Sequence, residues 1–260
     1  MNKYYNYMTK KIILFLIPLF FLALTITITT TIVKAATSVL PCSDPNGCPD
    51  LIVDQDVLNE WFIRKEKFSS EDCAVIEGET SVGLRKLLRV STGFPNIGPG
   101  ELFIGDPNNH PELFDFITCH SHAHFKEYAD YRLWTRKGYS DWNTLRQENP
   151  DALPSELLAA NPAIASQMVA GAKRGFCVID LYQYATTSPA KYTSCDYQGI
   201  SVGWADAYVY SLDGQWIDIT DVKAGTYILE VEVNAEQLFT EANYQNNRAS
   251  ISIKIPGLKK

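Results

Sequence analysis

The chain has 260 residues, of which 46% are hydrophobic and 20% are charged, an ordinary composition for a globular protein. This length is sufficient for one large domain or two small ones. The formal net charge of −7 argues against a nucleic-acid partner, because an acidic surface repels phosphates. The acidity suits cationic partners, although solubility alone is a sufficient reason for it.

An uncharged apolar run, residues 12–33, follows Lys10 and Lys11 near the N-terminus. We predict that residues 1–35 are a signal peptide and that residues 36–260 form one secreted, extracellular domain. Cleavage would change the net charge from −7 to −11, because the removed segment holds four lysines and no acidic residue. The run is also long enough to span a bilayer, so an uncleaved anchor, with membrane contact, is the alternative.

Secretion makes all six cysteines candidates for disulfide bonds. Cys42 and Cys48 flank the turn-forming sequence "SDPNG", which favours a small local loop. The other four cysteines allow three pairings, and their spacing does not choose among them: Cys73, Cys119, Cys177 and Cys195.

Segments rich in aromatic and β-branched residues dominate the rest of the chain, several of them with period two. The expected strands are residues 60–68, 85–92, 113–125, 128–135, 175–184, 203–211, 215–220, 226–234 and 249–255. One segment, residues 155–172, is of helical type, with Ser155 as its N-cap and Pro162 breaking it or starting a second helix. We therefore predict a mainly β, sandwich-like domain with long loops and a short helical insertion, held together by disulfides.

Three of the four histidines lie in the short sequence "CHSHAHF", at positions 120, 122 and 124. Alternate residues of a strand point to the same face, so we expect His120, His122 and His124 to project together. Three imidazoles suit Cu(II), Zn(II) or Fe(II), and three ligands leave a position open for catalysis. The spacing does not separate copper from zinc, and chance clustering on a polar surface is the plain alternative.

Three further segments are "GAKRGFC" at 171–177, "GWADAYVYSLDGQWIDITDVKAGTYILEVEVN" at 203–234 and "TEANYQNN" at 240–247. Together with "CHSHAHFKEYADYRL" at 119–133, they resemble, in the same order, the catalytic domain of the lysyl oxidase family. The resemblance runs from about Cys48 to Ile255, so residues 36–260 are interpreted as a lysyl oxidase-like catalytic domain. Because no appended domain and no glycosylation sequon are visible, we expect a secreted prokaryotic member.

The resemblance implies roles for particular residues. The copper ligands match His120, His122 and His124, and the quinone cofactor, lysine tyrosylquinone, matches Lys173 and Tyr208. It also implies that Cys73 pairs with Cys119 and that Cys177 pairs with Cys195. The family's calcium site matches Asp50, Leu51, Glu241, Asn243, Asn246 and Asn247.

The implied reaction is a copper-dependent oxidative deamination of peptidyl lysine or of small primary amines. It yields an aldehyde, hydrogen peroxide and ammonia, and it requires a base that accepts a proton from the substrate. Asp206 is the candidate base because it shares a strand face with Tyr208, although it could equally be a hydrogen-bonded structural residue.

Two other functions are weighed against this one. A secreted copper-binding or structural protein of the same fold, without catalysis, would be free to lose Lys173 or Tyr208, and both are present. A zinc hydrolase could use Glu127 as its base, but it leaves that lysine and tyrosine unexplained. The segment 135–172 is longer than the resemblance predicts, and Trp204 stands where animal enzymes have cysteine, so loop structure and substrate choice stay open.

Overall fold

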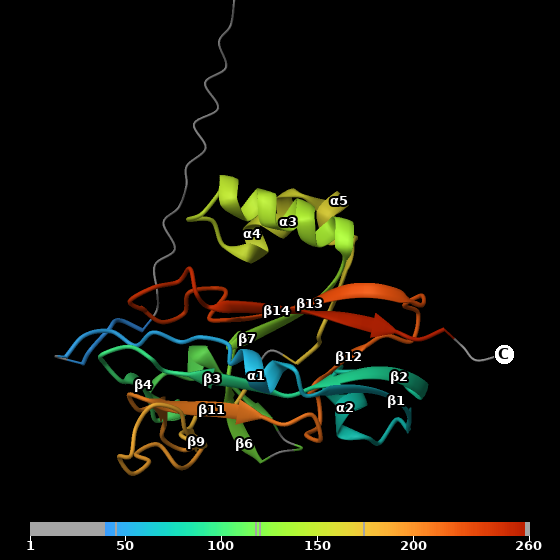
Figure 1. Ribbon diagram of the computed structural model, residues 1–260. Helices are drawn as coiled ribbons and strands as arrows, with labels where there is room; N and C mark the ends of the chain where they lie inside the picture. Colours follow the sequence, from blue (N-terminus) through green and yellow to red (C-terminus); the bar gives the residue numbers. More distant parts are fainter. Residues whose placement is uncertain (1–39, 45, 118, 120, 174, 258–260) are drawn as a thin grey trace, which may run out of the picture. The chain divides into compact units, whose positions relative to one another are not determined.

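The computed structural model describes residues 40–44, 46–117, 119, 121–173 and 175–257 (Figure 1). These residues form a mainly β fold in which strands from several antiparallel sheets surround one large hydrophobic core. The predicted fold class is therefore confirmed. The apolar run at 12–33, with the predicted signal cleavage site, lies outside the described residues. Among the described residues, no helix is long and apolar enough to cross a membrane.

The largest sheet has four antiparallel strands in the order β14-β13-β7-β8. Its strands are β7 (Ala129–Thr135), β8 (Met168–Ala170), β13 (Gly225–Val233) and β14 (Arg248–Ile255). Leu229 of β13 pairs with Leu133 of β7, and both are buried in the main core. Their neighbours Trp134 and Ile228 pack on the opposite face, as the alternation of a strand requires.

Four smaller sheets complete the strand structure. One three-stranded sheet contains β1 (Trp61–Phe68), β2 (Gly83–Val90) and β12 (Trp216–Asp218). The other contains β3 (Thr92–Pro95), β11 (Trp204–Tyr208) and β9 (Tyr182–Gln183). Two have two strands: β4 (Leu102–Gly105) with β10 (Gln198–Ile200), and β5 (Phe114–Ile117) with β6 (His122–Phe125).

Three helices follow β7 and cover one face of the largest sheet: α3 (Arg136–Glu148), α4 (Pro154–Ala160) and α5 (Pro162–Ala165). Figure 1 shows them together on one side of β13 and β14. The indole of Trp142 in α3 stacks on Trp134 of β7, with ring centres 5.5 Å apart. Beside them the buried guanidinium of Arg132 pairs with Glu230 at 3.1 Å and with Glu232 at 2.7 Å. The insertion is therefore a packed layer of the fold.

The remaining helices are short. α1 (Gln55–Leu58) precedes β1, α2 (Cys73–Ile76) connects β1 to β2, and two 3-10 turns, η1 (Pro107–Asn109) and η2 (Pro111–Leu113), lie between β4 and β5. The three disulfides join Cys42 to Cys48, Cys73 to Cys119 and Cys177 to Cys195. The pairing that the family resemblance implied is therefore present.

Several local predictions were wrong. Residues 113–125 form two strands, β5 and β6, rather than one. Most of 175–184 is irregular, with only β9 in it. The helical segment 155–172 is α4 and α5 followed by β8, and the N-cap of α4 is Leu153 instead of Ser155. The longest helix, α3, was not predicted, although Thr135 caps it by accepting a hydrogen bond from the Gly138 amide at 3.0 Å.

Candidate active site

The histidine segment is a hairpin rather than the single strand that the alternation predicted. Asp115 of β5 lies opposite His124 of β6, and Ser121, just before β6, has a φ of 56°. That left-handed conformation is one that turns use. The structure therefore places His122 and His124 on one strand, whereas His120 lies outside the described residues.

His122 and His124 project to the same side of β6. Their Nε2 atoms are 2.9 Å apart and their ring centres are 4.7 Å apart. His124 is 6% exposed, and His122 is half-buried. Two ring nitrogens this close can both reach one metal ion at the usual metal–nitrogen distance of about 2.0–2.1 Å. The donor set and its geometry therefore fit a single ion of the borderline class, such as copper.

The segment that carries Lys173 is fastened to β6 next to these histidines. The amide of Phe125 donates to the carbonyl of Phe176 at 2.7 Å, and the amide of Phe176 donates back at 3.0 Å. Gly175 lies against His124, because a Cβ at this position would be 3.3 Å from the His124 Cβ. Before the lysine, the amide of Gly171 donates to the carbonyl of Tyr131 at 2.8 Å. Lys173 thus sits in a short connection that is anchored at both ends.

The amine of Lys173 has two neighbours that define its position. Its Nζ donates a hydrogen bond to the carbonyl of Asp213 at 3.1 Å and lies 5.6 Å from the centre of the Phe176 ring. Burial lowers the pKa of Lys173 below its ordinary value, and the negative charge of Glu79 is the largest of the charges that oppose this shift.

A pocket of about 270 Å³ brings the candidate metal ligand and the candidate cofactor lysine together. Its lining residues are Glu77, Glu79, Asp115, His124, Lys126, Glu127, Ala172, Lys173 and Gly175. A metal bound at His124 and an amine entering this pocket would therefore share one space. Glu127, the base considered for a zinc hydrolase, also lies here.

Tyr208 is held in a different environment from Lys173. It is 9% exposed on β11, and its Oη lies 2.6 Å from the carbonyl oxygen of Cys177 and 2.7 Å from Oδ2 of Asp206. Asp206 is fully buried, and this burial raises its pKa well above the ordinary value, as it does for Tyr208. The phenol of Tyr208 has one proton and can donate to only one of these two oxygens. A protonated Asp206 would donate the other hydrogen bond, to the phenol oxygen.

Lys173 and Tyr208 share the ring of Phe176 as a neighbour. The Tyr208 ring centre is 4.4 Å from that of Phe176, and the lysine amine lies over the same phenylalanine. Among the described residues, each of the two groups is hydrogen-bonded to a different partner and none of these bonds joins them. A bond between the two therefore requires a side chain to move.

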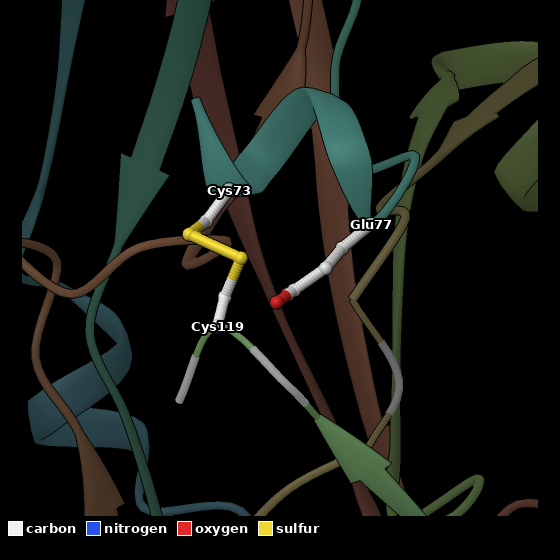
Figure 2. A group of neighbouring side chains, drawn as sticks. All are labelled: Cys73, Glu77 and Cys119. Atoms are coloured by element: carbon white, nitrogen blue, oxygen red, sulfur yellow. A yellow bond between two sulfur atoms is a disulfide. The ribbon is translucent and has the colours of Figure 1, made fainter. Parts of the chain in front are cut away.

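The ligand atoms of Cys73, Glu77 and Cys119 lie within 4.8 Å of one another beside this pocket. Figure 2 shows the two sulfurs joined in a disulfide and the Glu77 carboxylate pointing toward it from the end of α2. Sulfurs in a disulfide are not thiolates, so they are not metal ligands here. The disulfide instead ties α2 to the residue that precedes the histidines.

The residues matched to the calcium site come together between distant parts of the chain. Oδ1 of Asp50 accepts a hydrogen bond from the side-chain amide of Asn246 at 2.9 Å, and Oε1 of Glu241 accepts one from the side-chain amide of Asn247 at 2.6 Å. The backbone amide of Leu51 donates to Glu241 at 2.6 Å. Asn243 is separate: it is exposed, and its Oδ1 accepts from the Gln245 amide at 2.9 Å.

Two observations in this cluster fit a hard cation. The side-chain oxygens Oδ1 of Asn246 and of Asn247 are buried without a hydrogen-bond partner among the described residues. Burial also raises the pKa of Glu241 to about 8, which is the cost of an anion without a nearby positive charge. A bound Ca²⁺ would satisfy the amide oxygens and the carboxylates together.

Two residues escaped the sequence analysis: Phe176, which packs behind the pocket, and Glu79, which lines it. Phe176 lies inside the motif "GAKRGFC", where its position between a lysine and a disulfide gave no hint of its contact with Tyr208. Glu79 lies far from every motif in the sequence, and only the fold carries it to Lys173.

Residues 156–259 match the family model described as lysyl oxidase. The chain is 28% identical to human lysyl oxidase homolog 1 over 236 residues, which covers 84% of this chain and 35% of that protein. It is also 28% identical to human protein-lysine 6-oxidase over 235 residues, covering 81% of this chain and 46% of the other. The chain thus spans less than half the length of these relatives. The chain is therefore similar to the lysyl oxidases along most of its sequence.

Proposed function

We propose that the chain is a copper-dependent amine oxidase that uses a lysine tyrosylquinone made from Lys173 and Tyr208. The observation that carries this proposal is the pocket shared by His124 and Lys173, with Tyr208 behind it against Phe176. The substrates are peptidyl lysine or small primary amines, which dioxygen and water convert to aldehydes with release of hydrogen peroxide and ammonia. The similarity to protein-lysine 6-oxidase supports the class of reaction.

His120, His122 and His124 are the proposed copper ligands. The two described imidazoles already have their Nε2 atoms within reach of one ion, so little rearrangement of β6 is needed on binding. Copper and quinone together supply the redox chemistry, because no side chain of the chain oxidises an amine by itself.

The chain's own side chains hold and move the protons. Lys173 must leave the carbonyl of Asp213 and lose its proton before its amine can act as a nucleophile. Asp206 is the proposed base: its Oδ2 is 2.7 Å from the Tyr208 hydroxyl, so a substrate held at that ring would have its proton within reach. Burial raises the pKa of Asp206, which gives the carboxylate a high proton affinity once it is ionised.

We also propose a structural calcium ion at Asp50, Leu51, Glu241, Asn243, Asn246 and Asn247. The unpartnered oxygens of Asn246 and Asn247 support the site, and Leu51 would contribute backbone rather than side-chain atoms. Asn243 would have to give up its bond to Gln245 to join it. Disulfides and calcium both suit an extracellular protein, which is where an amine-bearing substrate would meet it.

Activity is tested on the mature chain, loaded with copper in air and assayed for peroxide release from a lysine-like amine. The copper-loaded protein should react with phenylhydrazine and turn over, while Lys173→Ala and Tyr208→Phe should lose both properties. A copper-binding protein that never reacts would instead be the non-catalytic alternative. Amine oxidation by Lys173→Ala at the wild-type rate would contradict the proposed cofactor.

A further inference from the structure

Glu79 lines the pocket beside Lys173, and the proposed function gives it no role. Its Oε2 is shielded from solvent and has no hydrogen-bond partner among the described residues. A carboxylate oxygen left in this state costs free energy unless a positive charge lies near it. We therefore expect a positively charged group near the Glu79 carboxylate.

The backbone fixes Glu79 in this place. Its amide donates to the carbonyl of Ala74 at 2.8 Å, and the amide of Thr80 donates to the same carbonyl at 3.0 Å. Ala74 belongs to α2, which the disulfide from Cys73 to Cys119 fastens next to the histidine hairpin. The carboxylate therefore enters the pocket from a rigid support.

One turn of the chain touches both Glu79 and Lys173. The carbonyl of Asp213 accepts the hydrogen bond from the lysine amine, and the next residue, Gly214, packs on the carboxylate. A Cβ at Gly214 would lie 2.5 Å from Oε2 of Glu79, closer than real Cβ contacts come, so a larger residue here would displace the carboxylate from its present position. Gly214 also has a φ of +75°, which glycine adopts without strain.

The charges of the two groups act on each other. Burial raises the pKa of Glu79 to about 7, and the positive charge of Lys173 is the main effect that opposes this rise. In turn, Glu79 is the strongest of the charges that favour the ammonium form of Lys173, ahead of Glu77 and Asp213. The pair is therefore electrostatically coupled across the pocket.

We propose that Glu79 is the positioning residue for Lys173: its carboxylate, seated on Gly214, holds the lysine ammonium in the histidine pocket until the cofactor forms. The inference rests on the proposed function for the fate of Lys173. For the restraint itself it rests on the shared pocket and on the turn at Asp213 and Gly214 that touches both residues. The carbonyl of Asp213 orients the lysine amine through a hydrogen bond, and the negative charge of Glu79 attracts its ammonium form.

Another carboxylate of the pocket has a lysine partner of its own. Asp115 forms an ion pair with Lys126 at 3.3 Å, and both line the same pocket. The chain thus offers two lysine–carboxylate pairs in one pocket, so each pair is the control for the other.

The test measures the reactivity of both lysines in the metal-free chain, before any cofactor exists. Pulses of acetic anhydride between pH 6 and pH 10, followed by peptide mass mapping, give the acetylation rate of Lys173 and of Lys126 in one digest. Glu79→Gln removes a charge that stabilises the ammonium, so the pKa of Lys173 should fall and its acetylation at pH 7 should rise about tenfold for a fall of about one in pKa. Glu79→Asp, which keeps the charge, should stay near the wild-type profile.

Asp115→Asn, which removes a pocket carboxylate that pairs with Lys126, should leave the Lys173 profile in place. An unchanged Lys173 profile in Glu79→Gln, or equal shifts from Glu79→Gln and Asp115→Asn, would overturn the proposal. If Glu79→Gln does not fold, as judged by its urea unfolding transition, Glu79→Ala decides, because it removes the charge without leaving an amide in the pocket. A higher acetylation rate of Lys173 in that variant supports the proposal, and an unchanged rate refutes it. Because no copper is present, these outcomes do not depend on whether Lys173 later joins Tyr208.

Discussion

Lys173 and Tyr208 meet the same phenylalanine ring, yet their surroundings differ in every other respect. Tyr208 is 9% exposed, with its hydroxyl between a buried carboxyl and a backbone carbonyl. Lys173 is half-buried in a pocket, and its amine has one hydrogen bond, to Asp213. The tyrosine belongs to the core, and the lysine belongs to the pocket wall.

This difference indicates which partner moves when the cofactor forms. Displacing Tyr208 would break two hydrogen bonds and open the aromatic core around Phe94 and Phe176. Displacing the lysine amine breaks one hydrogen bond to a carbonyl and a contact over a ring. We therefore expect Tyr208 to stay in place and Lys173 to swing past Phe176 toward it.

The largest expected effect concerns the pocket side of the comparison. His124→Ala removes a buried imidazole whose Nε2 is 2.9 Å from that of His122, so copper should fall from one ion per chain to almost none. Elemental analysis of the purified mature chain gives the stoichiometry. The matched control is His110→Ala, which removes a histidine that faces Glu112 at 3.6 Å and should keep its copper. Full copper in His124→Ala would contradict the assignment.

The next effect concerns the ring that separates the two regions. Phe176 is fully buried, so Phe176→Ala should lower the free energy of unfolding by about 3–5 kcal/mol. Phe116 is 70% exposed, and Phe116→Ala should cost less than about 0.5 kcal/mol. Urea unfolding of the two variants measures the contrast. Equal costs would mean that the aromatic core does not hold Tyr208 as described.

A smaller effect is expected at the oxygen cluster around Glu241, whose ligands contrast with the nitrogens of the histidine pocket. The folded-state pKa of Glu241 is raised to about 8 from 4.5 in the unfolded chain. Its contribution to stability is therefore complete below pH 4.5 and is lost as the pH rises through about 8. Calcium favours the ionised form of Glu241, so it should stabilise the chain most at high pH. At a calcium concentration of about one hundred times its Kd, the free energy of unfolding should rise by about 2.7 kcal/mol.

Urea unfolding at pH 5 and pH 8.5, with and without calcium, checks this prediction. Without calcium the wild-type chain should be less stable at pH 8.5 than at pH 5, and Glu241→Gln should show a smaller decline and no calcium effect. A calcium response that survives in Glu241→Gln would place the ion elsewhere. No response at either pH would leave the cluster as an ordinary hydrogen-bonded turn.

The sequence predicted well those features that depend on local pattern. Alternating apolar residues at 226–234 predicted β13. The pairs Cys73–Cys119 and Cys177–Cys195 were implied by the family resemblance, because the spacing of the cysteines left three pairings open. Asp206 and Tyr208 were expected on one face of a strand, and the 2.7 Å contact between their side chains agrees with this.

Other features were hidden because long-range packing decides them. The period-two pattern of "HSHAH" continues through the turn at Ser121, so nothing in it signals that β5 ends and β6 begins. The helix α3 was missed because tryptophan, glycine and asparagine weaken its helical pattern, and its stability comes from Trp142 packing on Trp134. The role proposed for Glu79 depends on Gly214 and Lys173, which are distant from it in sequence, so no local pattern could predict it.

The central claim is that Lys173 and Tyr208 become one cofactor, and peptide mapping tests it most directly. The mature chain is incubated with copper in air, digested with trypsin and examined by mass spectrometry. We predict a fragment that joins the Lys173 region to the Tyr208 region, with the mass expected for the two peptides linked through the quinone. This fragment should persist in Lys126→Ala, which removes the other lysine of the pocket, and it should be absent in Lys173→Ala. If the copper-loaded chain yields only the separate Lys173 and Tyr208 peptides while oxidising amines, the proposed cofactor is wrong.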